Sequence, residues 1–114
     1  MITKEIMEAA IFETVTRSSC ELSKDVHAAF ESAIRSEKRE RAKEAFETTL
    51  QSLDQSAKVR NPLCPDTGWP LFFSKVGNEA EIEGGVLALE EVAKGMVEKA
   101  TKEGYLRSTM KHPL

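Results

Sequence analysis

The chain has 114 residues, of which 40% are hydrophobic and 31% charged, and this length and balance are typical of one globular domain with a modest core. Its formal net charge of −3 provides no long-range attraction to nucleic acid or to anionic lipid, so we expect neither as a partner. No apolar run approaches the roughly 20 residues that cross a bilayer, and the amino terminus lacks the apolar region of a secretory signal. We therefore expect a cytoplasmic protein without a membrane partner.

The two cysteines, Cys20 and Cys64, lie far apart in the sequence and in unlike surroundings. This separation does not indicate a disulfide framework or a zinc site with closely spaced pairs of ligands. Cys20 follows two serines at a predicted helix junction, where a small apolar thiol packs readily, so we expect it to fill space in the core or near the surface. We do not expect it to act together with Cys64, because several predicted elements separate the two residues.

Three amphipathic helices are predicted in the first half of the chain from apolar residues at helical spacing. The first runs from Thr3 to about Arg17, with Thr3 as its N-cap, and two serines then interrupt the pattern. The second runs from Ser23 to about Glu37. In the third, the apolar pattern runs from Lys38 to Gln55, and the helix is predicted to end within residues 56–59. Glutamates are interleaved with the basic residues of the third helix, which favours a solvated face over a nucleic-acid interface.

A proline-rich loop at residues 61–70 separates these helices from the rest of the chain. Its three prolines fix φ and lack a backbone donor, so the loop cannot lie inside a helix or a central strand. Residues 71–76 predict a short strand, residues 81–83 a second extended piece, and Val86 to Glu103 a fourth helix with Gly104 as its C-cap. We predict a mainly α fold with a minor β component (α+β), in which about four amphipathic helices surround the loop-strand unit.

The loop carries a thiol and a carboxylate two residues apart, Cys64 and Asp66. A stiff loop with these two groups suits a metal or cluster ligand that has a polar group beside it. The same residues are equally compatible with an ordinary proline-rich connection that contains a buried cysteine. From these residues alone, both interpretations stay open.

Several blocks of the sequence, taken together, resemble the amino-terminal part of the alpha subunit in the iron-sulfur hydro-lyases of the class I fumarase and L(+)-tartrate dehydratase family. The blocks are residues 61–68 (NPLCPDTG), 70–77 (PLFFSKVG), 77–80 (GNEA), 82–85 (IEGG), 106–107 (LR) and 112–114 (HPL). The helices before the loop are similar to the family's helical lead-in. The resemblance therefore covers nearly the whole chain and implies that residues 1–114 are the amino-terminal portion of such a subunit, truncated within a domain.

The resemblance also implies roles for individual residues. In that family three cysteines hold a 4Fe-4S cluster whose fourth iron binds substrate, and Cys64 matches the first of them, whereas Cys20 matches none. The other two ligands are expected downstream. Asp66 matches the acidic residue beside the first cysteine, which implies substrate binding and a catalytic role. Arg107 matches the arginine of the Leu-Arg block, whose planar fork suits a dicarboxylate. Pro65 replaces a glutamine found in many fumarases, which counts against a preference for fumarate.

The function implied by the resemblance is reversible addition or removal of water on a small 2-hydroxydicarboxylate, malate to fumarate or tartrate to oxaloacetate. A 4Fe-4S cluster, a beta subunit or beta-type domain, and an oligomeric enzyme are expected with it. The 114 residues alone are expected to be inactive. The alternative is a non-catalytic helical interaction module, in which Cys64 is buried and Arg107 has a structural role.

Overall fold

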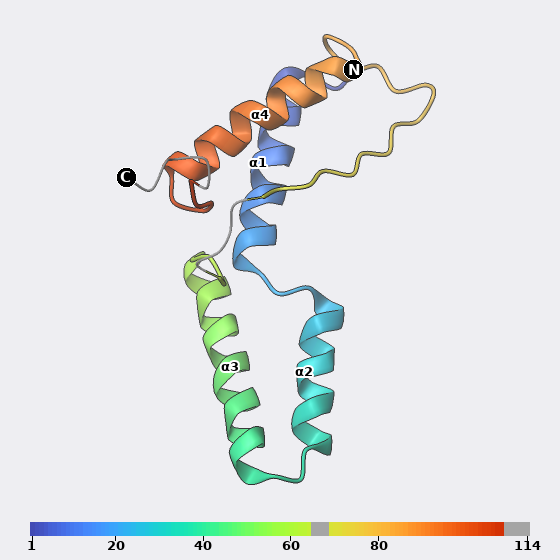
Figure 1. Ribbon diagram of the computed structural model, residues 1–114. Coiled ribbons are helices and arrows are strands. Elements are labelled where there is room, and N and C mark those ends of the chain that lie inside the picture. Colours follow the sequence, from blue (N-terminus) through green and yellow to red (C-terminus); the bar gives the residue numbers. More distant parts are fainter. Residues whose placement is uncertain (65–68, 109–114) are drawn as a thin grey trace.

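The computed structural model describes residues 1–64 and 69–108, and these residues form two pairs of helices (Figure 1). The helices are α1 (Lys4–Cys20), α2 (Lys24–Ser36), α3 (Glu40–Val59) and α4 (Val86–Lys102). Helix α1 packs against α4, and α2 packs against α3. The radius of gyration is 17.9 Å, whereas a compact domain of this length has a value of about 13 Å. The two pairs therefore form an extended arrangement rather than one rounded bundle.

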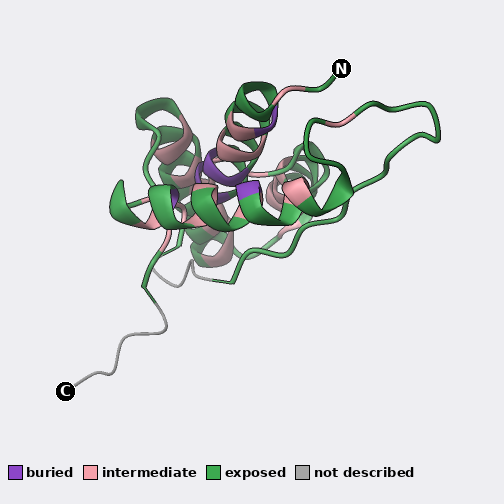
Figure 2. Ribbon diagram, turned by 90° about the horizontal axis from the view of Figure 1, so that it is seen from above, coloured by how far each residue is buried: buried purple, intermediate pink, exposed green. Residues whose placement is uncertain are grey.

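The small core lies between α1 and α4. Its buried apolar residues are Met7, Val15, Cys20, Val92 and Ala100. Figure 2 shows that the buried positions are confined to this pair of helices, whereas α2 and α3 have no buried residue. None of the described helices combines the length and apolar character that crossing a bilayer requires.

The pair α2 and α3 is joined mainly by side chains that remain partly accessible. Phe30 and Phe46 meet edge to face with their ring centroids 6.4 Å apart. The imidazole Nε2 of His27 lies 3.2 Å from Oδ1 of Asp54, across the same interface. Because little apolar surface is buried here, α1 and α4 form the better-packed part of the molecule.

The first two helices begin where the sequence predicts. The Thr3 hydroxyl accepts a hydrogen bond from the Ile6 amide at 3.4 Å, as expected for an N-cap, and α2 follows Ser23 directly. The predicted interruption of α1 is wrong, because the helix continues to Cys20. The Ser18 hydroxyl donates to the Val15 carbonyl at 2.9 Å, so this serine side chain bonds within the helix and does not end it.

Helix α3 begins at Glu40, two residues after the predicted start at Lys38, and ends at Val59, within the range 56–59 that the sequence predicts. Arg60 follows in the left-handed conformation, with φ of 53°. Its amide donates to the Ala57 carbonyl at 3.3 Å, and the Asn61 amide donates to the Ser56 carbonyl at 3.0 Å. This pattern is a Schellman helix end, in which an arginine takes the position that glycine usually occupies.

Helix α4 ends in the same way, at the place that the sequence predicts. Gly104 has φ of 85°, and its amide donates to the Thr101 carbonyl at 3.2 Å. The Tyr105 amide donates to the Ala100 carbonyl at 2.9 Å. Glycine adopts this conformation without the steric cost of a side chain, so the predicted helix end at Gly104 is confirmed, with Glu103 as the cap residue just before it.

The predicted strand at residues 71–76 is not formed. Within the described residues, the single β-bridge joins Ile2 and Ile82 in parallel, and residues 69–76 run as an extended segment outside the helices (Figure 1). The residues Trp69, Leu71 and Phe73 are 79%, 77% and 89% exposed. A strand requires a neighbouring backbone, and no described segment provides one here. The described fold is therefore mainly α, without the predicted β component.

Candidate functional site

The segment that leads to Cys64 begins at the left-handed turn of Arg60. The Arg60 guanidinium forms a two-pronged ion pair with the Glu13 carboxylate of α1, with Nη2–Oε2 at 3.0 Å and Nη1–Oε1 at 3.5 Å. This carboxylate, assisted by the side chain of Tyr105, raises the pKa of Arg60 above its usual value. A left-handed non-glycine residue is strained, and an ion pair open to solvent contributes little net stability. The contact therefore sets the direction of the chain after α3 more than it stabilises the fold.

Ser19, near the end of α1, contacts both segments that carry predicted site residues. The Leu63 amide donates to the Ser19 carbonyl at 2.9 Å. The Ser19 hydroxyl donates to the Tyr105 carbonyl at 2.5 Å, and Ser19 is only 6% exposed. Leu63 directly precedes Cys64, and Tyr105 lies two residues before Arg107. The end of α1 therefore connects the loop to the segment after α4.

Tyr105 is also held by its ring. The ring meets Phe12 of α1 edge to face, with centroids 6.1 Å apart. The ammonium of Lys99 lies over the Phe12 ring, 4.4 Å from its centroid. Ring and backbone contacts together fix the start of the segment that carries Arg107 against α1 and α4.

The structure describes two of the three predicted site residues, Cys64 and Arg107, but not Asp66. Cys64 is exposed and comes directly after the hydrogen-bonded Leu63. Arg107 is also exposed. Asp66 lies within residues 65–68, outside the described residues, so its placement stays a prediction. An exposed thiol on an anchored loop suits one metal or cluster ligand, but no group of three or more His, Cys, Asp or Glu in the described ranges could hold a metal by itself.

Cys20 is buried, with 1% of its surface exposed, as the sequence predicts. Burial raises the pKa of its thiol, although a hydrogen bond with Ser19 and the charge of Arg60 act in the opposite direction. Several elements separate Cys20 from the loop in the sequence, but the fold brings the two segments close. Cys20 is adjacent to Ser19, whose carbonyl binds Leu63, so the loop returns to the end of α1 that carries this cysteine.

A comparison with known families bears directly on this site. The sequence profile described as Fumarate hydratase (Fumerase) matches residues 8–114. The chain belongs to this fumarate hydratase family. The match covers α1 from Glu8 onward, the Cys64 loop and the segment of Arg107, so the elements joined through Ser19 lie within the family's sequence.

Two curated relatives agree with this membership. A Methanocaldococcus jannaschii protein named "Putative L(+)-tartrate dehydratase subunit alpha" is 32% identical over 104 residues, which are 91% of this chain and 36% of that protein. A Geobacillus stearothermophilus protein named "Putative fumarate hydratase class I" is 27% identical over an aligned length of 107 residues, and the alignment covers 90% of this chain and 20% of that protein. The fumarate hydratase family chain described here therefore spans about a third or less of the curated relatives it matches.

The sequence did not reveal the residues that position the loop in this fumarate hydratase family chain, namely Glu13, Ser19, Arg60 and Tyr105. A buried serine at a helix end has no distinct pattern, and we interpreted Ser19 as part of an interruption. Tyr105 had a usable signal, because the residue after a left-handed C-cap glycine commonly packs back onto its helix. The ion pair between Glu13 and Arg60 joins two helices that are distant in sequence, so no local spacing indicates it.

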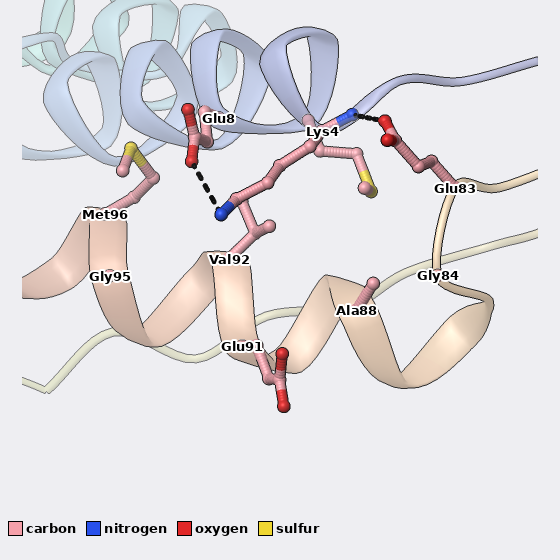
Figure 3. A pocket seen from close by; sticks show the side chains of 10 residues that line it. Lys4, Glu8, Glu83, Gly84, Ala88, Glu91, Val92, Gly95 and Met96 are labelled. Carbon is pink, nitrogen blue, oxygen red and sulfur yellow. Dashed lines mark hydrogen bonds and ion pairs between the residues drawn. The ribbon is translucent and has the colours of Figure 1, made fainter.

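A cavity of ≈ 320 Å³ lies at the other end of α1 and is separate from this site (Figure 3). Met7, Val92 and Met96 supply its apolar wall. At its rim, the Lys4 amide donates to Glu83 Oε2 at 2.7 Å. The helix rise places Lys4 about 22 Å from Ser19 along α1, so the cavity is not part of the Cys64 site.

Proposed function

We propose that residues 1–114 are the amino-terminal portion of the alpha subunit of an iron-sulfur hydro-lyase. The complete enzyme would add water to, or remove it from, a small 2-hydroxydicarboxylate, with malate/fumarate and tartrate/oxaloacetate as the candidate pairs. Family membership and the names of the two relatives support this proposal. The observation that supports it most is the attachment of the Cys64 loop and the Arg107 segment to one buried residue, Ser19.

Cys64 is proposed as one ligand of a 4Fe-4S cluster. Its exposure leaves the thiol accessible to an iron outside the described helices, whereas the buried Cys20, with its raised thiol pKa, is a poor candidate. A cluster bound here would supply a Lewis acid at an iron without a protein ligand. The bonds at Leu63 and Arg60 would hold Cys64 in place without help from the metal.

Arg107 and Asp66 are proposed to act on the substrate. The planar guanidinium of Arg107 would bind a carboxylate through two parallel hydrogen bonds and would compensate for the negative charge of the chain. Asp66 would accept a hydrogen bond from the substrate hydroxyl and take part in proton transfer there. Both roles follow from the family blocks in which these residues occur.

The exposed segment at residues 69–76 is proposed to be covered in the complete enzyme. Phe72 and Ser74, with Val86 and Leu87 of α4, line a mostly apolar groove of ≈ 400 Å³. We propose that the predicted strand at residues 71–76 forms there against the remaining part of the enzyme, and that a beta subunit or beta-type domain completes an oligomer. A cytoplasmic location suits this enzyme, because reducing conditions preserve thiol ligands.

The test is anaerobic reconstitution of the complete enzyme with iron and sulfide, followed by assays with malate and with tartrate. Cys64→Ser is expected to lose most of the cluster absorbance and activity, since a hydroxyl replaces a thiolate poorly on iron. Cys20→Ala is the matched control and should retain both, because this thiol is buried in the core. A Cys64→Ser enzyme with unchanged iron content and activity would remove Cys64 as a cluster ligand. A reconstituted wild-type enzyme without cluster and without activity would favour the alternative, a non-catalytic helical interaction module.

A further inference from the structure

We infer that Ser19 is the residue that positions the substrate arginine, Arg107, relative to the cluster ligand Cys64. This inference rests on the proposed hydro-lyase function and adds a positioning residue to it. Ser19 uses two different groups: its backbone carbonyl accepts from Leu63 at 2.9 Å, and its hydroxyl donates to the Tyr105 carbonyl at 2.5 Å. The two partners are 42 residues apart in the chain, from Leu63 to Tyr105, so their proximity depends on the tertiary structure.

Cys64 and Arg107 are close in the chain to the residues that Ser19 binds, so the contact can position both of them. Consecutive Cα atoms are about 3.8 Å apart, so Cys64 is one such step from an anchored residue and Arg107 is two steps from another. A displacement of Tyr105 would therefore be transmitted to Arg107 with little loss.

Ser19 is itself held firmly. It lies in the last turn of α1, between Thr16, which is fully buried, and Cys20, which is 1% exposed. The Thr16 hydroxyl donates to the Phe12 carbonyl, and Phe12 also packs against the ring of Tyr105. The hydroxyl of Ser19 therefore extends from a fixed backbone towards the segment after α4.

The neighbouring serine provides a matched control. The Ser18 hydroxyl donates to the Val15 carbonyl at 2.9 Å, within α1, and does not reach the Tyr105 segment. Ser18→Ala and Ser19→Ala therefore remove the same atoms from adjacent positions of one helix. Only the second substitution removes the bond to Tyr105, and it leaves the Ser19 carbonyl available to Leu63.

The experiment compares these two variants in the complete enzyme. Without cluster, Ser19→Ala should increase amide hydrogen exchange in peptides that cover residues 103–108, and Ser18→Ala should not. With cluster, Ser19→Ala should raise the KM for the dicarboxylate about fivefold, while kcat stays within about twofold and the cluster absorbance is unchanged. Ser19→Cys, with a similar shape and a weaker donor, should show the same effect in smaller size and replaces Ser19→Ala if that variant does not fold.

Each result is decisive. Wild-type exchange at residues 103–108 together with a wild-type KM in Ser19→Ala would overturn the inference. A parallel loss of cluster and kcat without a change in KM would also overturn it, because the hydroxyl would then support the cluster loop instead of Arg107. If the wild-type enzyme has no hydro-lyase activity, the proposed function fails, whereas the exchange measurement still decides whether Ser19 holds the segment.

Discussion

Arg60 and Glu13 join the end of α3 to the middle of α1 through a two-pronged ion pair, with Nη2–Oε2 at 3.0 Å. The pair accompanies an arginine with φ of 53°, a conformation that an L residue adopts at some cost. Strain next to a proposed ligand loop is a common feature of functional sites. The ion pair therefore serves to place Cys64 more than to stabilise the helices.

The first prediction separates these two effects. Arg60→Gly removes the ion pair but also relieves the left-handed strain, so its melting temperature should stay close to that of the wild type. Glu13→Gln removes the charge while the strain remains, and it should lower the free energy of unfolding by up to about 1 kcal/mol. Both variants should increase the alkylation rate of Cys64. If alkylation follows stability instead, with no increase in Arg60→Gly, the ion pair does not orient the loop.

The sequence predicted the helices well because each has a local signal. The Thr3 cap, the start of α2 after Ser23 and the glycine end of α4 all depend on residues a few positions apart. In the site, the sequence predicted only the residues that the family resemblance assigns, Cys64, Asp66 and Arg107. Contacts such as those from Ser19 to Leu63 and Tyr105 join residues that are distant in sequence, and no periodicity encodes them. The strand at residues 71–76 failed for a related reason, because strand-forming side chains do not supply a neighbouring strand.

The second prediction concerns Arg107. Arg107→Lys in the complete enzyme should raise the KM for the dicarboxylate at least about tenfold and leave the cluster spectrum intact, because lysine keeps the charge but loses the two parallel donors. Arg39→Lys is the control, since the Arg39 side chain is 83% exposed and, among the described residues, its ion-pair partner is the nearby Glu37. Steady-state kinetics would measure both. Equal KM values in the wild type and Arg107→Lys would give Arg107 a structural role.

The third prediction concerns pH and Cys20. Burial raises the pKa of this thiol in the folded chain, so its contribution to stability is fully present below about pH 9, the ordinary pKa of a cysteine. Above that pH the unfolded chain loses the proton first, and the contribution falls as the pH rises. The melting temperature of the wild type should therefore decrease more between pH 8.5 and 10 than that of Cys20→Ala. Parallel curves for the two proteins would show that the thiol ionises equally in both states.

The last prediction concerns the 114-residue polypeptide studied alone. It should give helical circular dichroism, bind no stoichiometric 4Fe-4S cluster and show no dehydratase activity, because it offers one suitable thiolate where a cluster needs several ligands. It should also self-associate through the exposed apolar side chains of residues 69–76, which include Phe73 at 89% exposure.

Sedimentation of matched variants would identify the associating surface. Phe73→Ser should reduce self-association, whereas Val59→Ser, at a residue that is 53% exposed at the end of α3, should not. Removal of a large exposed aromatic group lowers the apolar area that a second molecule can cover, and at about 25 cal/mol per Å² this effect should be visible as a higher concentration for half-association. A monomeric wild-type polypeptide with a full cluster and turnover would instead mean that residues 1–114 contain the whole catalytic site.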